Sequence, residues 1–345
     1  MESANQYQPV QPVPSPQRRG NRGCIWAAAI LGGLGLLTLL ALVFAIATIG
    51  GSSGGSAAPV TWDEQFVSGT GTDKIAVLPV EGAIGDGGGG VLGGQGATPE
   101  NLNSQLMQAA EDDSVRAIVI EVNSPGGGVV ASDQMYRDIL DFKRETRKPV
   151  VVSMGDTAAS GGYYISMAAD RIVANPATIT GSLGVILSYL NYEDAAKRLG
   201  LKQVVIKSGP YKDIGSPTRD LTAEERRILQ DLIDDSYNQF VEVIDAGRAG
   251  LTREQVLPLA NGRIYSGKDA KEVGLVDVLG DLDTAAGEAR KLAKLDEATV
   301  VRYEQTPGFL SLLTSRLQPQ EPEALTVLKA AGFDPSPRLE YMYRP

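Results

Sequence analysis

Two glycine-rich turns carry the residues of this sequence that could do chemistry. In the first, residues 156–169 (DTAASGGYYISMAA), Ser160 stands between small residues, after an apolar run that ends at Met154 and before a helical stretch. A helix N-terminus offers free amide N–H groups and the positive end of the helix dipole, which together stabilise an oxyanion. Ser160 is therefore a candidate nucleophile, although the G-x-S-x-G pattern is absent. A serine that only caps the helix is the alternative.

The second turn, residues 123–128 (NSPGGG), directly follows the apolar run 116–122 (RAIVIEV). In open α/β sheets, ligands bind at the carboxyl ends of strands, where exposed backbone N–H groups can contact them. No Lys-Ser or Lys-Thr pair follows the glycines, so the turn does not match a phosphate-binding loop. We expect it to supply one amide of an oxyanion hole, from Gly127 or its neighbour Gly126, with the other amide coming from Gly161.

The base that activates such a serine is not a histidine, because the 345-residue sequence contains none. This excludes Ser-His-Asp and Cys-His catalysis and histidine-ligated metal sites within the chain. A carboxylate or a lysine remains, and a lysine acts as a base only where partial desolvation lowers its pKa. Lys207 and Lys212 both lie in a turn-rich stretch, KSGPYKDIGSP. These residues alone do not choose between the two lysines.

Short apolar runs alternate with helical patterns through the middle of the chain. Such alternation predicts an α/β domain in which helices cover a largely parallel sheet. The expected strands are residues 74–80, 116–122, 149–154, 171–174 and 204–207. The expected helices are residues 100–110, 132–146, 222–247 and 266–273, the third of them with a capping box formed by Thr222 and Glu225.

A long uncharged segment precedes this domain. No charge occurs from residue 24 to residue 50, and residues 25–49 are almost wholly apolar. At about 1.5 Å per residue this run spans roughly 37 Å, enough to cross a hydrocarbon core of about 30 Å. It is longer than the roughly 7–15 apolar residues of a cleaved signal peptide, which is the main alternative. Arginines before the span and none for a long way after it place the N-terminus in the cytoplasm and the later residues outside.

The sequence therefore divides into five parts: a disordered cytoplasmic tail (1–23), a transmembrane helix (24–50), a flexible Gly/Ser-rich stalk (51–62), the α/β domain (63–305) and a Pro-rich C-terminal tail (306–345). The formal net charge is −10, which argues against nucleic acid as a partner. The one cysteine, Cys24, cannot form a disulfide within the chain and gives no information on redox compartment.

Four motifs belong together: MGDTAASGGYYIS, NSPGGG, TGSLGVI at 180–186 and YKD at 211–213, with GRIYSGKDAKEVGLVD at 262–277 in addition. Over roughly residues 74–283 the chain resembles the bacterial signal peptide peptidase family, also called protease IV, in its half-length, membrane-anchored form. That family has a Clp-protease/crotonase-like α/β fold. NSPGG by itself is shared with the proteolytic subunit of Clp protease, so the combination of motifs carries the resemblance.

The resemblance implies a serine endopeptidase with Ser160 as nucleophile, Lys212 as general base and Ser182 as the residue that orients the lysine. It implies oxyanion amides at Gly161 and Gly127, and neither cofactor nor metal. The substrates would be hydrophobic peptides, such as released signal peptides, and the catalytic domain would lie on the extracytoplasmic side of the cell membrane.

The resemblance also implies that several copies of the chain assemble. In full-length members, one of two tandem domains contributes the lysine and the other the serine. A half-length chain that keeps this geometry would form a ring, and the family implies a homo-octamer in which Lys212 serves the Ser160 of a neighbour.

Two other functions fit parts of the sequence. A crotonase-like acyl-CoA enzyme would usually show a nucleotide site, often basic, and would not need a membrane anchor. A non-catalytic membrane scaffold would have no use for Ser160, Ser182 and Lys212 occurring together.

Overall fold

The computed structural model describes residues 61–85, 96–305 and 338–342. The predicted cytoplasmic tail, the predicted transmembrane segment and most of the predicted stalk lie outside the described residues. Among the helices of the described ranges, none combines the length and the apolar character needed to cross a membrane.

The described residues form strands and helices that alternate along the chain. The strands are β1 (Asp63–Gly69), β2 (Lys74–Glu81), β3 (Val115–Ser124), β4 (Gly126–Gly128), β5 (Val150–Ala159), β6 (Arg171–Ala174), β7 (Ile179–Gly181), β8 (Ile186–Ser188), β9 (Ile264–Ser266), β10 (Val278–Leu279), β11 (Thr299–Glu304) and β12 (Arg338–Met342). The helices are α2 (Pro99–Glu111), α3 (Val129–Thr146), α4 (Gly161–Ser166), α5 (Glu193–Arg198), α6 (Ala223–Gly247), α7 (Arg253–Val256), α8 (Gly267–Glu272) and α9 (Leu282–Leu292).

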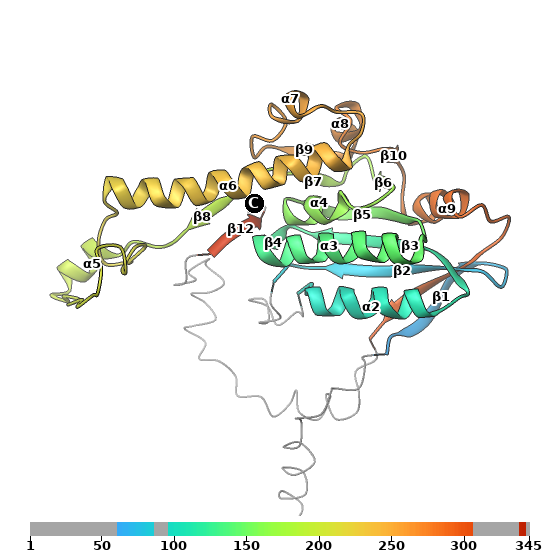
Figure 1. Ribbon diagram of the computed structural model, residues 1–345, viewed down its shortest axis with the longest axis horizontal. Helices are drawn as coiled ribbons and strands as arrows, with labels where there is room; N and C mark the ends of the chain where they lie inside the picture. The colour runs from blue at the N-terminus through green and yellow to red at the C-terminus, as the bar shows by residue number, and fades with distance from the viewer. Residues whose placement is uncertain (1–60, 86–95, 306–337, 343–345) are drawn as a thin grey trace, which may run out of the picture. The chain divides into compact units, whose positions relative to one another are not determined.

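The main sheet has the strand order β1-β11-β2-β3-β5-β6-β10 (Figure 1). The pairs from β11 to β10 along this order are parallel, and only the edge pair of β1 with β11 is antiparallel. Beyond the end of β5, the short strand β7 continues the parallel pairing and in turn pairs with β9. The predicted fold class, an α/β domain with a mainly parallel sheet, is confirmed.

Both faces of the main sheet are buried, and this explains why its strands are nearly continuous apolar runs. In β3, Ile118 and Ile120 point into the core under α2 and α3, whereas Ala117 and Val119 point into a second cluster that includes α9. Because successive side chains of a strand face opposite sides, helices on both sides are needed to cover them. The core therefore holds the carboxyl ends of β3 and β5, which carry both glycine-rich turns, in fixed positions.

A second, three-stranded sheet has the order β4-β12-β8, and β12 runs antiparallel to both neighbours. Strand β4 is the glycine-rich turn that follows β3, while β12 comes from the C-terminal tail. Residues more than 200 positions apart in the sequence are thus joined at the carboxyl end of the main sheet.

Most of the predicted helices and strands are present, but the prediction of one strand is wrong. The capping box of α6 forms as predicted: the N–H of Glu225 donates to the Thr222 hydroxyl, and the N–H of Thr222 donates to the Glu225 carboxylate. Residues 204–207, predicted as a strand, have no regular secondary structure, and the side chain of Ile206 is 97% exposed. A strand needs a neighbour to pair its backbone groups, and none of the described strands lies beside this segment.

Helix α6 carries a projecting part of the domain. Its 25 residues span roughly 37 Å, but the apolar residues it buries all lie in its second half: Phe240, Val241, Val243 and Ile244. Its N-terminal end lies away from α4, together with α5 and the turns that precede α6 (Figure 1). Residues 189–222 and the first half of α6 are called the arm below.

Candidate active site

Ser160 occupies a strained turn between β5, which ends at Ala159, and α4, which begins at Gly161. Its φ is +52°, a left-handed conformation that is uncommon for a residue with a side chain. Two backbone hydrogen bonds hold it there: its N–H donates to the Gly181 carbonyl (2.8 Å), and its carbonyl accepts from Tyr164 N–H (2.8 Å).

The hydroxyl of Ser160 does not cap the helix. The residue is only 1% exposed, and its Oγ has no hydrogen-bond partner among the described residues. Although Ser160 is the N-cap residue of α4, its side chain makes no capping bond. A buried hydroxyl without a partner costs free energy, so some other group is expected to bond it in the working enzyme.

The backbone of β4 presents an amide beside Ser160. Ile84 N–H donates to the Gly126 carbonyl and Gly128 N–H donates to the Ile84 carbonyl, both at 2.9 Å, so the N–H of Gly127 faces the opposite side. A Cβ at Gly161 would lie 3.1 Å from the Gly127 nitrogen, which shows how closely these two glycines approach. The structure therefore brings Ser160, Gly161 and Gly127 together, as predicted from the two turns.

Gly126 allows this approach. Its φ is +95°, and a Cβ there would lie 2.5 Å from the Gly161 nitrogen. Any side chain at this position would therefore intrude on the space between the two predicted oxyanion amides.

The pairing of β5 with β7 brings Ser182 close to the turn that carries Ser160. The end of β5 pairs with β7, so that Ala159 lies opposite Gly181, and Ser182 follows directly. Ser182 also has a positive φ, +51°, and its N–H donates to the Arg263 carbonyl (2.7 Å). The half-buried Ser182 is thus one residue from the carbonyl that holds the Ser160 backbone.

Lys212 lies on the arm and is exposed. The next residue, Asp213, accepts hydrogen bonds from Lys207 (2.5 Å) and from Arg219 (2.8 Å). Arg219 also pairs with Glu225 in the first turn of α6, at 2.5 Å. Lys207 is therefore engaged with a carboxylate, whereas Lys212 is exposed.

The arm extends away from α4, the helix that directly follows Ser160 (Figure 1). Glu225, to which the Lys212 turn is tied, precedes Phe240 by fifteen residues, roughly 22 Å along the helix. Phe240 packs on Tyr164 of α4, with ring centroids 5.1 Å apart, four residues from Ser160. The structure thus does not bring Lys212 and Ser160 together within one chain.

Strand β12, which the sequence analysis did not foresee, lies directly beside Ser160. Tyr341 pairs with Gly127, the residue whose N–H faces β12. The Tyr341 carbonyl oxygen and the Gly161 nitrogen lie 2.0 and 2.5 Å from the position that a Cβ of Gly126 would occupy. A peptide carbonyl therefore stands next to both predicted oxyanion amides. The only hint in the sequence is a short alternation of polar and apolar residues, RLEYMY, within a Pro-rich tail.

The surroundings of Tyr341 are aromatic, with the Asp133 carboxylate nearby. Burial raises the pKa of the Tyr341 hydroxyl and also that of Tyr164, which in addition donates to Asp133 (2.8 Å). Both phenols therefore stay protonated. Among the residues that the structure describes, no cluster of three or more Cys, Asp or Glu side chains could hold a metal ion.

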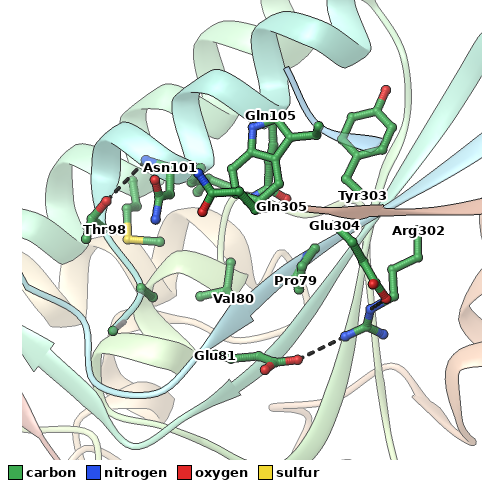
Figure 2. Close-up of a pocket in the computed structure, with 15 residues that line it drawn as sticks. Pro79, Val80, Glu81, Thr98, Asn101, Gln105, Arg302, Tyr303, Glu304 and Gln305 are labelled. Atoms are coloured by element: carbon green, nitrogen blue, oxygen red, sulfur yellow. Dashed lines mark hydrogen bonds and ion pairs between the residues drawn. The ribbon is translucent and has the colours of Figure 1, made fainter. Parts of the chain in front are cut away.

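A separate cavity of about 320 Å³ lies between β2, α2 and β11 (Figure 2). Arg302 closes one side of it by pairing with Glu81 (2.9 Å) and with Glu121. Gln105 lines the cavity, and its buried side-chain oxygen has no partner among the described residues. None of the predicted catalytic or oxyanion residues lines this cavity.

Fold and site together define an α/β peptidase of the Clp-protease type, and comparison with known proteins agrees. Residues 95–179 match the Clp protease family, and residues 142–296 match Peptidase family S49. The chain is 35% identical to "Putative signal peptide peptidase SppA" of Enterococcus faecium, over 81% of this chain and 84% of that protein. It therefore belongs to peptidase family S49, and it is a serine peptidase.

Longer relatives contain the same region. The chain is 39% identical to "Protease 4" of Salmonella typhi over 74% of its own length, but this covers only 41% of that protein. It is 34% identical to "Serine protease SPPA, chloroplastic" of Arabidopsis thaliana, over 65% of this chain and 33% of that protein. This chain thus matches well under half of each longer relative.

Proposed function

We propose that this protein is a membrane-anchored endopeptidase that cuts extended hydrophobic peptides with a Ser160/Lys212 dyad. The observation that carries the proposal is strand β12, a peptide segment lying antiparallel between β4 and β8 with one carbonyl beside the Gly127 and Gly161 amides. A substrate that takes the place of β12 pairs its backbone with both strands, as in other cases of strand addition. Such binding suits a peptide and not an acyl-CoA.

The reaction has two steps, acylation of Ser160 and hydrolysis of the resulting ester. Neutral Lys212 takes the Ser160 proton as Oγ attacks the peptide carbonyl. The resulting oxyanion accepts hydrogen bonds from the N–H groups of Gly127 and Gly161. The C–N bond breaks and the lysine passes its proton to the leaving amine. Water then attacks the Ser160 ester, with the lysine again as base; the ester C–O bond breaks, the lysine returns the proton to Ser160 Oγ, and the new carboxyl end is released.

The lysine of each active site comes from a neighbouring copy of the chain. Lys212 stands on an arm that extends away from α4, and the Ser160 hydroxyl has no hydrogen-bond partner among the described residues. Ser182, next to the β5–β7 pair, orients the incoming lysine. The arm also exposes apolar side chains, which a second copy would cover: Leu199, Leu201, Val204 and Ile206. Head-to-tail contacts repeated around an axis close into a ring, for which we propose eight copies.

The sequence and the relatives support the proposed substrate class and location. Residues 25–49 have the length and composition of a single transmembrane helix, and the arginines that precede them support a peptidase domain outside the cytoplasm. The Enterococcus faecium relative is named for signal peptides. We therefore propose hydrophobic peptides left in or near the membrane, released signal peptides among them, as substrates.

The test is covalent labelling of the full-length protein in detergent with a fluorophosphonate, followed by intact mass and peptide mapping. One adduct on Ser160 is expected, with loss of cleavage of a synthetic signal peptide. The Ser160→Ala protein is the control and should take up no label and cut nothing. Labelling of another serine, or cleavage by the Ser160→Ala protein, would assign the chemistry elsewhere.

A further inference from the structure

Ser132 carries a second buried hydroxyl beside the predicted oxyanion amides. The residue is 0% exposed, and its Oγ, like that of Ser160, has no hydrogen-bond partner among the described residues. Ser132 stands in the first turn of α3, which begins directly after β4, the strand that presents the Gly127 amide. The steps assigned to Ser160 and Lys212 make no use of this hydroxyl.

The Ser132 oxygen packs against the backbone of Gly161. A Cβ built on Gly161 would lie 2.5 Å from Ser132 Oγ and 3.1 Å from the Gly127 nitrogen. The Gly126 Cα lies 3.1 Å from the same point. Atoms of α3 and β4 thus converge on one side of the Gly161 Cα. Because the first N–H groups of a helix have no partner inside that helix, the direction of the Gly161 N–H depends on how such contacts place its backbone.

Other hydroxyls on the helices of this chain behave differently. Thr146, Ser166 and Ser236 each donate to the carbonyl four residues earlier in their own helix, at 2.7, 2.7 and 3.0 Å. Serine and threonine commonly make this bond when they lie inside a helix. The hydroxyl of Ser132 does not make it, and its oxygen lies against Gly161 instead.

We infer that Ser132 is a positioning residue of the oxyanion site, and that its oxygen holds the Gly161 backbone where the Gly161 amide meets the oxyanion. The inference rests on the proposed function, because it concerns the oxyanion amides of the same reaction. A buried hydroxyl without a partner costs free energy. Such a cost next to a reacting serine is expected where a site is arranged for activity at the expense of stability.

The experiment compares the full-length Ser132→Ala protein with the wild type in peptide cleavage. Loss of the oxygen removes the contact of Gly161 with α3, so we expect kcat to fall about tenfold. KM should stay within about twofold, because strand pairing of the peptide with β4 and β8 remains. The Tm should equal or exceed that of the wild type, because the variant loses a buried hydroxyl that has no partner.

Thr146→Ala, on the same helix, is the matched control. The Thr146 hydroxyl has partners: it donates to the Phe142 carbonyl (2.7 Å) and accepts from the Lys148 N–H (3.1 Å). Its removal should lower the Tm and leave kcat unchanged. The two variants should therefore differ from wild type in opposite ways, Ser132→Ala in activity and Thr146→Ala in stability.

A double variant tests whether Ser132 acts through Gly161. Gly161→Ala alone would place its methyl group 2.5 Å from Ser132 Oγ, and we expect it to lower kcat by about a hundredfold. Adding Ser132→Ala frees that space, so kcat should recover by about threefold or more. Ser132→Ala would thus harm the wild type and help the Gly161→Ala protein, whereas the effects of independent substitutions multiply.

Unchanged kcat in Ser132→Ala, or a clearly lowered Tm together with lost activity, would overturn the positioning role. So would effects of Ser132→Ala and Gly161→Ala that simply multiply. Labelling of Ser160 by a fluorophosphonate separates these results from failure of the proposed function. We expect labelling of Ser132→Ala to be about tenfold slower than that of wild type, because the phosphonyl oxygen takes the place of the oxyanion. Equal labelling rates would refute only the role of Ser132, and a wild-type chain that neither labels nor cuts would refute both proposals.

Discussion

At the scale of single residues, the backbone around Ser160 is more informative than its hydroxyl. A positive φ on a non-glycine residue costs on the order of 1–3 kcal/mol and persists only where neighbours fix it. Here β7 and the first turn of α4 both bond the Ser160 backbone. Strain held in this way, at the junction of a strand and a helix, fixes the position of the buried hydroxyl.

Substitution of the two lysines in the KSGPYKD stretch should have different effects on activity. We expect Lys212→Ala to lower kcat/KM by about a thousandfold or more, because it removes the base. Lys207→Ala should stay within a few-fold of wild type, because Arg219 still holds Asp213. Peptide hydrolysis by the two purified variants, with circular dichroism as a control for folding, decides the assignment. An inactive Lys207 variant beside an active Lys212 variant would reverse it.

Activity should rise from neutral towards alkaline pH. A lysine takes a proton from serine only in its neutral form, which becomes more abundant as pH rises. The measurement is kcat/KM for one peptide between about pH 5 and pH 10. A maximum below about pH 6 would indicate a carboxylate base instead of a lysine.

At the scale of elements, β4 should tolerate no side chain at its first residue. Gly126→Ala would place a Cβ 2.5 Å from the Gly161 nitrogen, at φ +95°. We expect a loss of activity of about a hundredfold and a destabilisation of roughly 1–3 kcal/mol. Gly287→Ala is the control, since it lies in α9 with nothing within 4 Å of its Cβ position, and it should leave activity unchanged. Normal peptidase activity in Gly126→Ala would show that β4 does not form the oxyanion site.

One arginine, Arg219, ties the turn that carries Lys212 to the first turn of α6. Arg219, followed by the N–H of Thr222, holds the pKa of Glu225 at about 2, below its usual 4.5. Since this pKa is lowered on folding, the stabilisation is complete above about pH 4.5 and is lost as pH falls through about 2. At neutral pH the network is therefore intact in the wild-type arm.

Arg219→Ala should loosen the turn that carries Lys212 even at neutral pH. We expect faster hydrogen exchange in residues 207–222 and at least a tenfold loss of activity, with no change of exchange in β3 or β5. Arg144→Ala is a comparison, because Arg144 makes only an exposed pair with Asp141 on α3. Unchanged exchange in the arm of Arg219→Ala would mean that other contacts position Lys212.

At the scale of the whole molecule, the proposal requires two chains for one active site. Ser160→Ala and Lys212→Ala chains, each inactive alone, should regain activity when they assemble together. In random one-to-one mixtures about a quarter of the sites would pair an intact serine with a neighbour's intact lysine, so about a quarter of wild-type activity is expected. Native mass spectrometry confirms mixed particles. No recovery in such particles would place both residues of each site in one chain.

The close approach of the two glycine-rich turns was predictable from the sequence. The turns around Ser160 and Gly127 follow buried strands, and parallel strands place their carboxyl ends together, so a few residues of context were enough. The absence of histidine narrowed the possible bases without any structure. The capping box of α6 was also predictable from the sequence, because it depends only on residues three positions apart.

The tertiary structure alone decided what depends on distant parts of the chain. Residues 204–207 have the composition of a strand but find no partner among the described strands, and β12 has a weak pattern but pairs with β4 and β8. Strand pairing depends on hydrogen bonds between segments far apart, which local sequence does not encode. Likewise, a Ser160/Lys212 dyad shared between chains was predicted only through the family resemblance, and the fold shows that the Lys212 turn is tied to the first turn of α6, roughly 22 Å along the helix from Phe240. Distance between chemically matched residues is set by packing, and only the folded chain shows it.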